Sequence, residues 1–331
     1  MLLRRFTAST RVIPGLMIII ALFIIALVMT IAAKDNDQPD KPSYTAAGGK
    51  KAAAAPKPSE QPGSAEEYTF PEGGRELLPQ YRFVALYGTP TSTRMGSLGE
   101  QSLDASIARV KKLADAYRPH SKEPIYPAFE VIASVASATP TNDNDYSNEL
   151  DPQTLRPWVD AAKKAGVYVV LDLQPGREHF LTQAKRYESL LKEPHVGLAL
   201  DPEWRLTPSQ VHLEQIGRVS AAEINSVSDW LARLTMGNHL PQKLFLLHQF
   251  RSSMITHRER LNMSHKSLAY VIQMDGNGAQ STKADTWRII TGDAPKGMYF
   301  GWKNFYDEDH PMLKASQTMQ ISPKPWFVSY Q

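Results

Sequence analysis

The sequence predicts an α/β fold, a (β/α)8 TIM barrel preceded by a single transmembrane helix and a disordered linker. Eight short apolar runs of strand length lie between residues 81 and 331, segments with helix signals separate most of them, and an uncharged apolar run lies near the N-terminus. Eight strands alternating with helices over about 250 residues is the count of a closed barrel. An open doubly wound sheet is the alternative, but no glycine-rich phosphate-binding motif follows the first strand.

The N-terminus has the pattern of a membrane anchor. Residues 1–11 contain three arginines and precede an uncharged apolar run at residues 12–33, and about 20 such residues cross a bilayer. The arginines favour a cytoplasmic tail, so residues 12–33 form a signal-anchor in the lipid bilayer and the following chain lies outside the cytoplasmic membrane. Secretion after signal cleavage is the alternative, because Ile31-Ala32-Ala33 resembles a cleavage site.

A linker follows the apolar run. Residues 34–77 are rich in Ala, Pro, Lys, Gly and Ser without apolar periodicity, which predicts a disordered spacer before the barrel domain at residues 78–331. The 331-residue chain contains no cysteine, so the hydrophobic core must stabilise the fold without disulfides. The formal net charge of +3 gives no reason to expect a nucleic-acid partner.

The eight predicted strands are rich in apolar, β-branched and aromatic residues. They lie at residues 81–88, 125–134, 166–174, 195–203, 243–250, 268–275, 297–304 and 326–331.

Helix signals occur between the strands. Residues 102–118 carry apolar side chains at helical spacing, and residues 151–166 open on an Asp-Pro pair and close on a glycine. Residues 220–234 begin with Ser220 followed three residues later by Glu223, the pattern of a capping box. Further helices are expected after the third, fifth, sixth and seventh strands.

Polar and aromatic side chains stand near the C-terminal ends of these strands, where barrels of this type carry their sites. They are Tyr87, Glu130, Asp172, Gln174, Asp201, Glu203, Trp204, His248, Gln249, Gln273, Asp275, Trp302 and Asn304. Because side chains alternate along a strand, Asp201 and Glu203 share a face with Ala199, and this small residue favours the barrel interior. Both acids are therefore expected to point into the barrel mouth.

Several carboxyl groups in one barrel mouth repel one another, so at least one of them should have a raised pKa. Glycosidic cleavage requires a proton-donating acid beside an ionised one. We therefore expect catalytic roles for Asp172, Asp201, Glu203 and Asp275. The remaining residues named above would bind substrate, because aromatic rings can cover the apolar faces of sugars and amides can bind hydroxyls. Lys303 and Arg205 suit an anionic polymer or a pairing with the carboxylates.

The end of the fourth strand, Asp201-Pro202-Glu203, resembles the Asp-x-Glu with which some TIM-barrel glycoside hydrolases end a strand, including lysozyme-type and chitinase-type barrels. The resemblance implies a glycoside hydrolase in which Glu203 donates the proton and Asp201 supports it. The longer chitinase pattern D-x-x-D-x-D-x-E is absent, because Val196 and Ala199 stand at the upstream aspartate positions. The substrate-assisted mechanism of chitinases is therefore not implied.

The expected function is that of a membrane-anchored glycoside hydrolase-like protein acting on a cell-envelope or extracellular polysaccharide, without metal or cofactor. A non-catalytic glycan-binding barrel in cell-envelope assembly is one alternative. A metal-dependent phosphoester hydrolase is another, with Asp172, Asp201 and Glu203 around a hard cation. The His/Cys spacing of a zinc site is absent, as is the G-x-S-x-G of a serine hydrolase. Residues 136–150 are long and polar enough for a lid or a plug.

Overall fold

The computed structural model describes residues 68–331, and the predicted cytoplasmic tail, the signal-anchor and most of the linker lie outside the described residues. None of the helices between Tyr68 and Gln331 is both long and apolar enough to cross a membrane.

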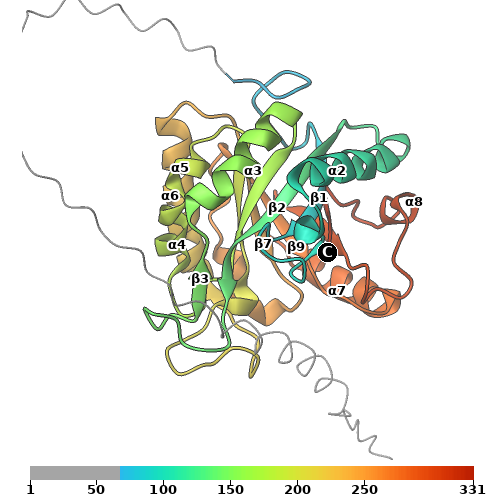
Figure 1. Ribbon diagram of the computed structural model, residues 1–331. Helices are drawn as coiled ribbons and strands as arrows, with labels where there is room; N and C mark the ends of the chain where they lie inside the picture. The colour runs from blue at the N-terminus through green and yellow to red at the C-terminus, as the bar shows by residue number, and fades with distance from the viewer. Residues whose placement is uncertain (1–67) are drawn as a thin grey trace, which may run out of the picture. The chain divides into compact units, whose positions relative to one another are not determined.

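Eight parallel strands close into a barrel, which confirms the predicted TIM-barrel fold (Figure 1). Each strand follows a predicted one closely, because fully buried runs of branched and aromatic residues mark strands well. In order around the barrel they are β1 (Arg82–Gly88), β2 (Ile125–Ala136), β4 (Tyr168–Leu173), β5 (Val196–Leu200), β7 (Lys243–His248), β9 (Leu268–Met274), β10 (Tyr299–Asn304) and β11 (Phe327–Tyr330), which pairs with β1.

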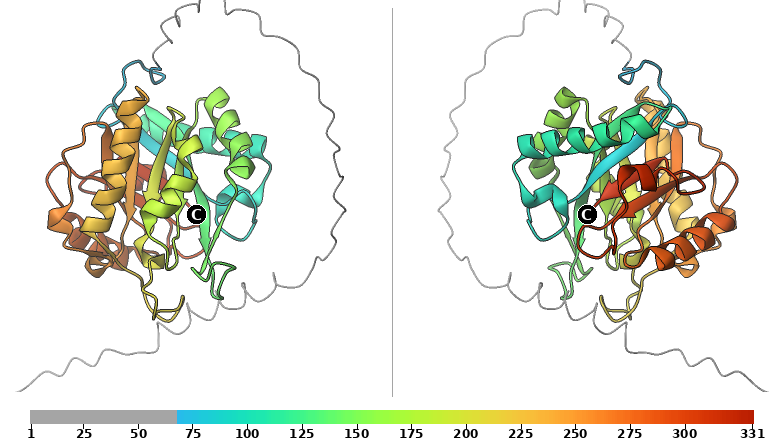
Figure 2. Two further views of the ribbon diagram at one scale, coloured as in Figure 1. Left: turned by 90° about the vertical axis from the view of Figure 1, so that its left-hand side faces the viewer. Right: turned by 90° about the vertical axis from the view of Figure 1, so that its right-hand side faces the viewer.

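Helices surround the barrel on the outside (Figure 2). They are α2 (Leu103–Tyr117), α3 (Pro152–Ala165), α4 (Phe180–Arg186), α5 (Glu188–Leu191), α6 (Ala221–Gly237), α7 (Gln280–Gly292) and α8 (Ala315–Thr318). The Asp151 carboxylate caps α3 by accepting from the Gln153 amide at 2.8 Å, and Gly166 ends it in the left-handed region at φ 67°. The Ser220 hydroxyl caps α6 by accepting from the Glu223 amide at 3.2 Å.

The helix predicted after the fifth strand is wrong. Between β7 and β9 the chain forms two short 3-10 turns, η5 (Ser252–Met254) and η6 (Arg258–Arg260), and the two-residue strand β8 (Ile255–Thr256), which pairs with β6 (Val219–Ser220). His257 adopts a left-handed backbone at φ 56°, which interrupts any helix at that position. Asn262 accepts from the Ser264 amide at 3.1 Å, a local bond that competes with helical hydrogen bonding.

Residues 136–150, expected as a lid or a plug, partly continue the sheet. β3 (Ser147–Glu149) pairs antiparallel with the end of β2 at Ser134–Ala136. The Ser147 hydroxyl donates to the Gln174 carbonyl at 2.8 Å, so the returning segment is tied to the end of β4.

Apolar side chains fill the barrel interior from its N-terminal end upward. Phe83, Tyr126 and Tyr168 point inward from β1, β2 and β4 and belong to one buried cluster that also contains Phe70 and Leu77. Residues 68–77 therefore pack against the barrel end, and the folded part extends further toward the N-terminus than the linker boundary expected at residue 77. Apolar side chains close this end of the barrel, and the buried polar side chains of the barrel interior lie at the opposite end.

Candidate active site

Seven polar side chains form a ring inside the C-terminal end of the barrel. We call this set the mouth ring: Tyr87 of β1, Glu130 of β2, Asp172 of β4, Asp201 directly after β5, His248 of β7, Gln273 of β9 and Lys303 of β10. Each lies two positions beyond a small or apolar inner residue, so strand alternation turns it inward as well. None of the seven exposes more than 3% of its surface.

His248 is the centre of the mouth ring. Its Nδ1 lies 2.8 Å from Oδ2 of Asp275, and its Nε2 lies 2.8 Å from Oε1 of Glu130 and 3.9 Å from Oδ1 of Asp172. Although burial alone would lower the pKa of His248, the carboxylates of Asp172, Glu130 and Asp275 raise it well above its ordinary value. The imidazole is therefore protonated at neutral pH and donates from both nitrogens.

Tyr87 and Lys303 complete another side of the ring. The Tyr87 hydroxyl donates to Oδ2 of Asp172 at 2.9 Å, and the Lys303 ammonium lies 3.3 Å from the centre of the Tyr87 ring. Burial and the neighbouring Asp172 raise the pKa of Tyr87 well above its ordinary value, so the phenol keeps its proton and remains a donor. Gly301 precedes Lys303 on the inner face, where a side chain would collide with Oε1 of Gln273.

Glu203 differs from the ring because it is only partly buried. It lies in the 3-10 turn η4 (Pro202–Trp204), directly after Asp201 and Pro202. Within residues 68–331 its carboxyl group takes part in no hydrogen bond or ion pair. Burial, followed by repulsion from Asp275, raises the pKa of Glu203 to about 8. Glu203 is therefore a carboxylic acid at neutral pH, with a proton to donate.

Two ring aspartates also have raised pKa values. Burial, and then the neighbouring Glu203, raises the pKa of Asp201 well above its ordinary value. Burial also raises the pKa of Asp172, although His248 partly opposes the shift. The mouth holds five carboxyl groups but only two cationic side chains, His248 and Lys303. This excess of carboxyl groups over cationic side chains, together with burial, accounts for the raised pKa values.

Unpaired acceptor atoms are concentrated at the mouth. Five buried oxygens there have no hydrogen-bond donor within the described part of the chain: Glu130 Oε2, Asp172 Oδ1, Asp201 Oδ1, Gln273 Oε1 and Asp275 Oδ1. Buried acceptors are normally satisfied. Molecules with several donors, such as water or the hydroxyls of a sugar, would satisfy them.

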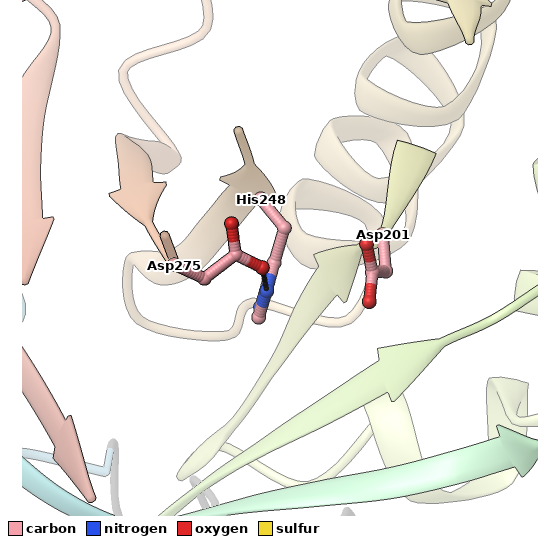
Figure 3. Close-up of side chains that lie close together, drawn as sticks. All are labelled: Asp201, His248 and Asp275. Carbon is pink, nitrogen blue, oxygen red and sulfur yellow. Dashed lines mark hydrogen bonds and ion pairs between the residues drawn. The ribbon is translucent and has the colours of Figure 1, made fainter. Parts of the chain in front are cut away.

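The mouth also contains a group with the spacing of metal ligands. One atom each of Asp201, His248 and Asp275 lie within 4.8 Å of one another (Figure 3). Both nitrogens of His248 already lie at hydrogen-bond distance from carboxylates. A metal would have to displace the imidazole proton and one carboxylate partner, so these residues fit an imidazolium between carboxylates better than a metal ligand.

The structure does not bring all predicted site residues to the mouth. Trp302 and Asn304 have the opposite strand parity to Lys303; Trp302 packs against Met274 and Trp287 outside the barrel and donates to Asn304 at 2.9 Å. The structure therefore places these two residues away from the mouth, because they were chosen by their position at the end of the strand without regard to alternation.

Four further residues lie around the edge of the site. Gln249 accepts from Arg258 at 2.9 Å and supports the loop after β7, so its side chain does not point into the mouth. Trp204 packs against His212, with ring centres 5.5 Å apart. The Gln174 amide lies 3.5 Å from the Tyr87 hydroxyl and accepts from the Ala136 amide at 3.0 Å. Arg205 pairs with Glu223 at 2.9 Å instead of with the mouth carboxylates.

The comparisons with known proteins leave the family open. No protein-family model and no curated protein matches the sequence. A xylanase and alpha-amylase inhibitor protein from Scadoxus multiflorus is similar in structure, with 11% identity and a TM-score of 0.41 over 75% of this chain and 92% of that chain. Thermotoga maritima Cel5A in complex with cellobiose has 8% identity and a TM-score of 0.39 over 76% of this chain and 87% of that chain. Likeness at this level says nothing about activity.

Proposed function

We propose that the barrel mouth is the active site of a glycoside hydrolase in which Glu203 is the general acid. The observation that carries the proposal is the place of Glu203, which lies partly accessible beside the mouth ring and has no side-chain hydrogen bond or ion pair within residues 68–331. Burial and the neighbouring Asp275 raise the pKa of Glu203 there to about 8. An acid whose pKa lies near the working pH suits proton transfer to a glycosidic oxygen.

The second carboxylate must be ionised to act as nucleophile or base. Asp172 and Asp201 are poor candidates because their pKa values are raised. Asp275 is the better one, since it is paired with the His248 imidazolium at 2.8 Å and keeps one oxygen, Oδ1, unpartnered within the described residues. His248 would hold this carboxylate in place, and Glu130 would orient His248 from the opposite side.

Asp201 and Asp172 then bind the substrate. Each has a buried oxygen, Oδ1, without a donor within the described residues, and this oxygen can accept a hydrogen bond from a sugar hydroxyl. Tyr87 fixes Asp172 at 2.9 Å, so the orientation of that carboxyl group is set before substrate arrives. Gln273 contributes a buried acceptor oxygen on the other side of the mouth.

Release of reducing ends from a panel of polysaccharides tests the proposal. The full-length protein is compared with Glu203→Gln, which keeps the shape of the side chain but has no proton to transfer, and with Glu214→Gln, which changes an exposed glutamate. We expect the wild-type protein to hydrolyse at least one glycan. Glu203→Gln should lower the rate of hydrolysis about 100-fold or more, and Glu214→Gln should leave it unchanged. Equal product release by Glu203→Gln would refute the role of Glu203, and glycan binding without turnover would favour the non-catalytic alternative.

We also propose that residues 12–33 anchor the protein in the cytoplasmic membrane with the barrel outside. The support is the uncharged apolar run behind three arginines. Protease added to intact cells should digest the barrel domain while a tag before residue 12 survives in the membrane fraction. Recovery of the protein in the medium without residues 1–33 would instead indicate a cleaved signal.

A further inference from the structure

A second pocket, which we call the arginine pocket, lies on the same end of the barrel as the mouth. It has a volume of about 340 Å³ and is lined by the loops after β4 and β5, by the start of α6 and by β8; its polar lining includes Arg177, His179, Arg205, Arg218, Ser220 and Glu223. The loops after β4 and β5 begin at the C-terminal ends of these strands, which is the end of the barrel where the mouth ring lies.

The arginine pocket is joined to the turn that carries Glu203. The Gly217 amide donates to the Glu203 carbonyl at 2.7 Å, and the Arg218 amide donates to the Arg205 carbonyl at 3.0 Å. A side chain at position 217 would collide with the carbonyls of Pro202, Glu203 and Arg205, so glycine permits this close approach. The backbone of Arg218 is therefore fixed next to the segment that directly follows the proposed acid.

One arginine of the pocket is neutralised. Arg205 donates from Nε to Oε1 of Glu223 at 2.9 Å and from Nη1 to the Leu206 carbonyl at 2.5 Å. Glu223 also accepts from the Phe180 amide at 3.1 Å, so it joins the starts of α4 and α6 to the β5 loop instead of completing a capping box. The Arg205–Glu223 ion pair therefore has a structural role in the pocket.

Two positive charges remain without a carboxylate partner within residues 68–331. The Arg177 guanidinium donates only to the Gln210 carbonyl, at 3.1 and 2.7 Å, and lies 3.9 Å from the centre of the Tyr146 ring; these contacts hold it in place. Arg218 is exposed, and its guanidinium has no hydrogen bond or ion pair there. The N-terminus of the 17-residue helix α6 adds its positive dipole at Ser220.

We propose that the arginine pocket binds an anionic group, a carboxylate or phosphate, carried by the glycan whose adjoining sugar occupies the mouth. The assignment of the glycan rests on the proposed function, whereas the assignment of an anion rests on the pocket itself. Guanidinium groups bind carboxylate and phosphate through paired charge-assisted hydrogen bonds. The substrate class is therefore an acidic polysaccharide, with its charge held outside the acidic mouth.

Calorimetric titration of the full-length protein tests the pocket without any need for turnover. The probes are glucuronate, inorganic phosphate and, as a neutral reference, glucose. We expect one of the two anions to bind about tenfold more tightly than glucose at low salt, and Arg218→Gln to weaken it about tenfold. Arg233→Gln, a change of an exposed arginine on α6 outside the pocket, should leave binding unchanged. Tighter binding of glucuronate points to uronic acids, and tighter binding of phosphate to a phosphorylated glycan.

The two proposals fail in different ways. Anion binding that depends on Arg218 in a protein that cleaves no glycan would refute the proposed hydrolase and retain the anionic ligand. If neither anion binds more tightly than glucose, or if Arg218→Gln and Arg233→Gln bind like wild type, the pocket proposal is overturned, whatever the hydrolysis assay shows.

Discussion

The Nδ1 atom of His248 lies 2.8 Å from Oδ2 of Asp275, and its other ring nitrogen reaches Glu130 at the same distance. β7 and β2, which carry His248 and Glu130, are not neighbours in the sheet. One imidazolium therefore connects separate walls of the barrel and offsets carboxylates that would otherwise repel one another. The stability of the mouth and the proposed chemistry depend on the same contact.

Replacing His248 should destabilise the fold. His248→Ala leaves Glu130 and Asp275 buried without their cationic partner, and breaking such a buried pair costs about 3–5 kcal/mol of unfolding free energy. Urea denaturation at pH 7 measures the loss. His120→Ala, at an exposed position, should change stability by less than about 0.5 kcal/mol. A similarly small loss for His248→Ala would contradict the central role of the imidazole.

Removing the Tyr87 hydroxyl should weaken the mouth more mildly. Tyr87→Phe deletes the 2.9 Å hydrogen bond to Asp172 and leaves a buried acceptor unsatisfied, at a cost of about 1–3 kcal/mol. Urea denaturation at pH 7 measures this loss of unfolding free energy. Tyr299→Phe, which removes a tyrosine hydroxyl near the other end of the barrel, is the matched control. Equal stability of the two variants would show that the bond to Asp172 is not formed.

Residues before the expected domain boundary should contribute to the core. Phe70 is 1% exposed and its ring lies 6.1 to 6.4 Å from those of Tyr81, Tyr126 and Tyr168. We expect Phe70→Ala to lower the unfolding free energy by about 3–5 kcal/mol. Met236→Ala, at a largely exposed position, provides the comparison. If Phe70→Ala is as mild as Met236→Ala, residues 68–77 do not pack as described.

The contribution of Glu203 to stability should fall as the pH rises through the neutral range. Burial raises the pKa of Glu203 to about 8 in the folded state, whereas an unfolded chain has the ordinary glutamate value of about 4.3. The contribution of Glu203 to the unfolding free energy is therefore fully present below about pH 4 and is lost as the pH rises through 8. Glu203→Gln carries no charge at any pH, so its stability relative to wild type should increase over this range.

Thermal or urea denaturation at several pH values measures this difference. Glu214→Gln, in the exposed part of the loop after β5, should follow the wild-type curve. Parallel curves for wild type and Glu203→Gln would mean that the pKa of Glu203 is not raised.

The sequence predicted the barrel well because its strands are buried on both faces. Runs such as Tyr168–Leu173 and Lys243–His248 are apolar enough to stand out, and Asp151 and Ser220 marked two helix starts. The absence of an α-helix after β7 was not predictable from spacing alone. It depends on the left-handed backbone of His257 and on the pairing of β8 with β6.

The site was only partly predictable. Strand alternation predicted that Asp201 points into the barrel mouth, where the structure also has Asp172, His248 and Gln273. The same rule, applied to the seventh predicted strand, would have selected Lys303 over Trp302. Contacts between strands distant in sequence could not be predicted, including the bond from His248 to Glu130. The arginine pocket had no local signal, because Arg177 and Arg218 are brought together by loops without a repeating pattern.

The pKa of Glu203 is the quantity on which the account most depends. It can be measured by following the carboxyl carbons of 13C-labelled glutamate by NMR from pH 4 to 10, with the Glu203 signal assigned by its loss in Glu203→Gln. We predict a titration midpoint at about 8. A midpoint near the ordinary glutamate value of about 4.3 would mean that Glu203 is ionised at neutral pH and has no proton to donate.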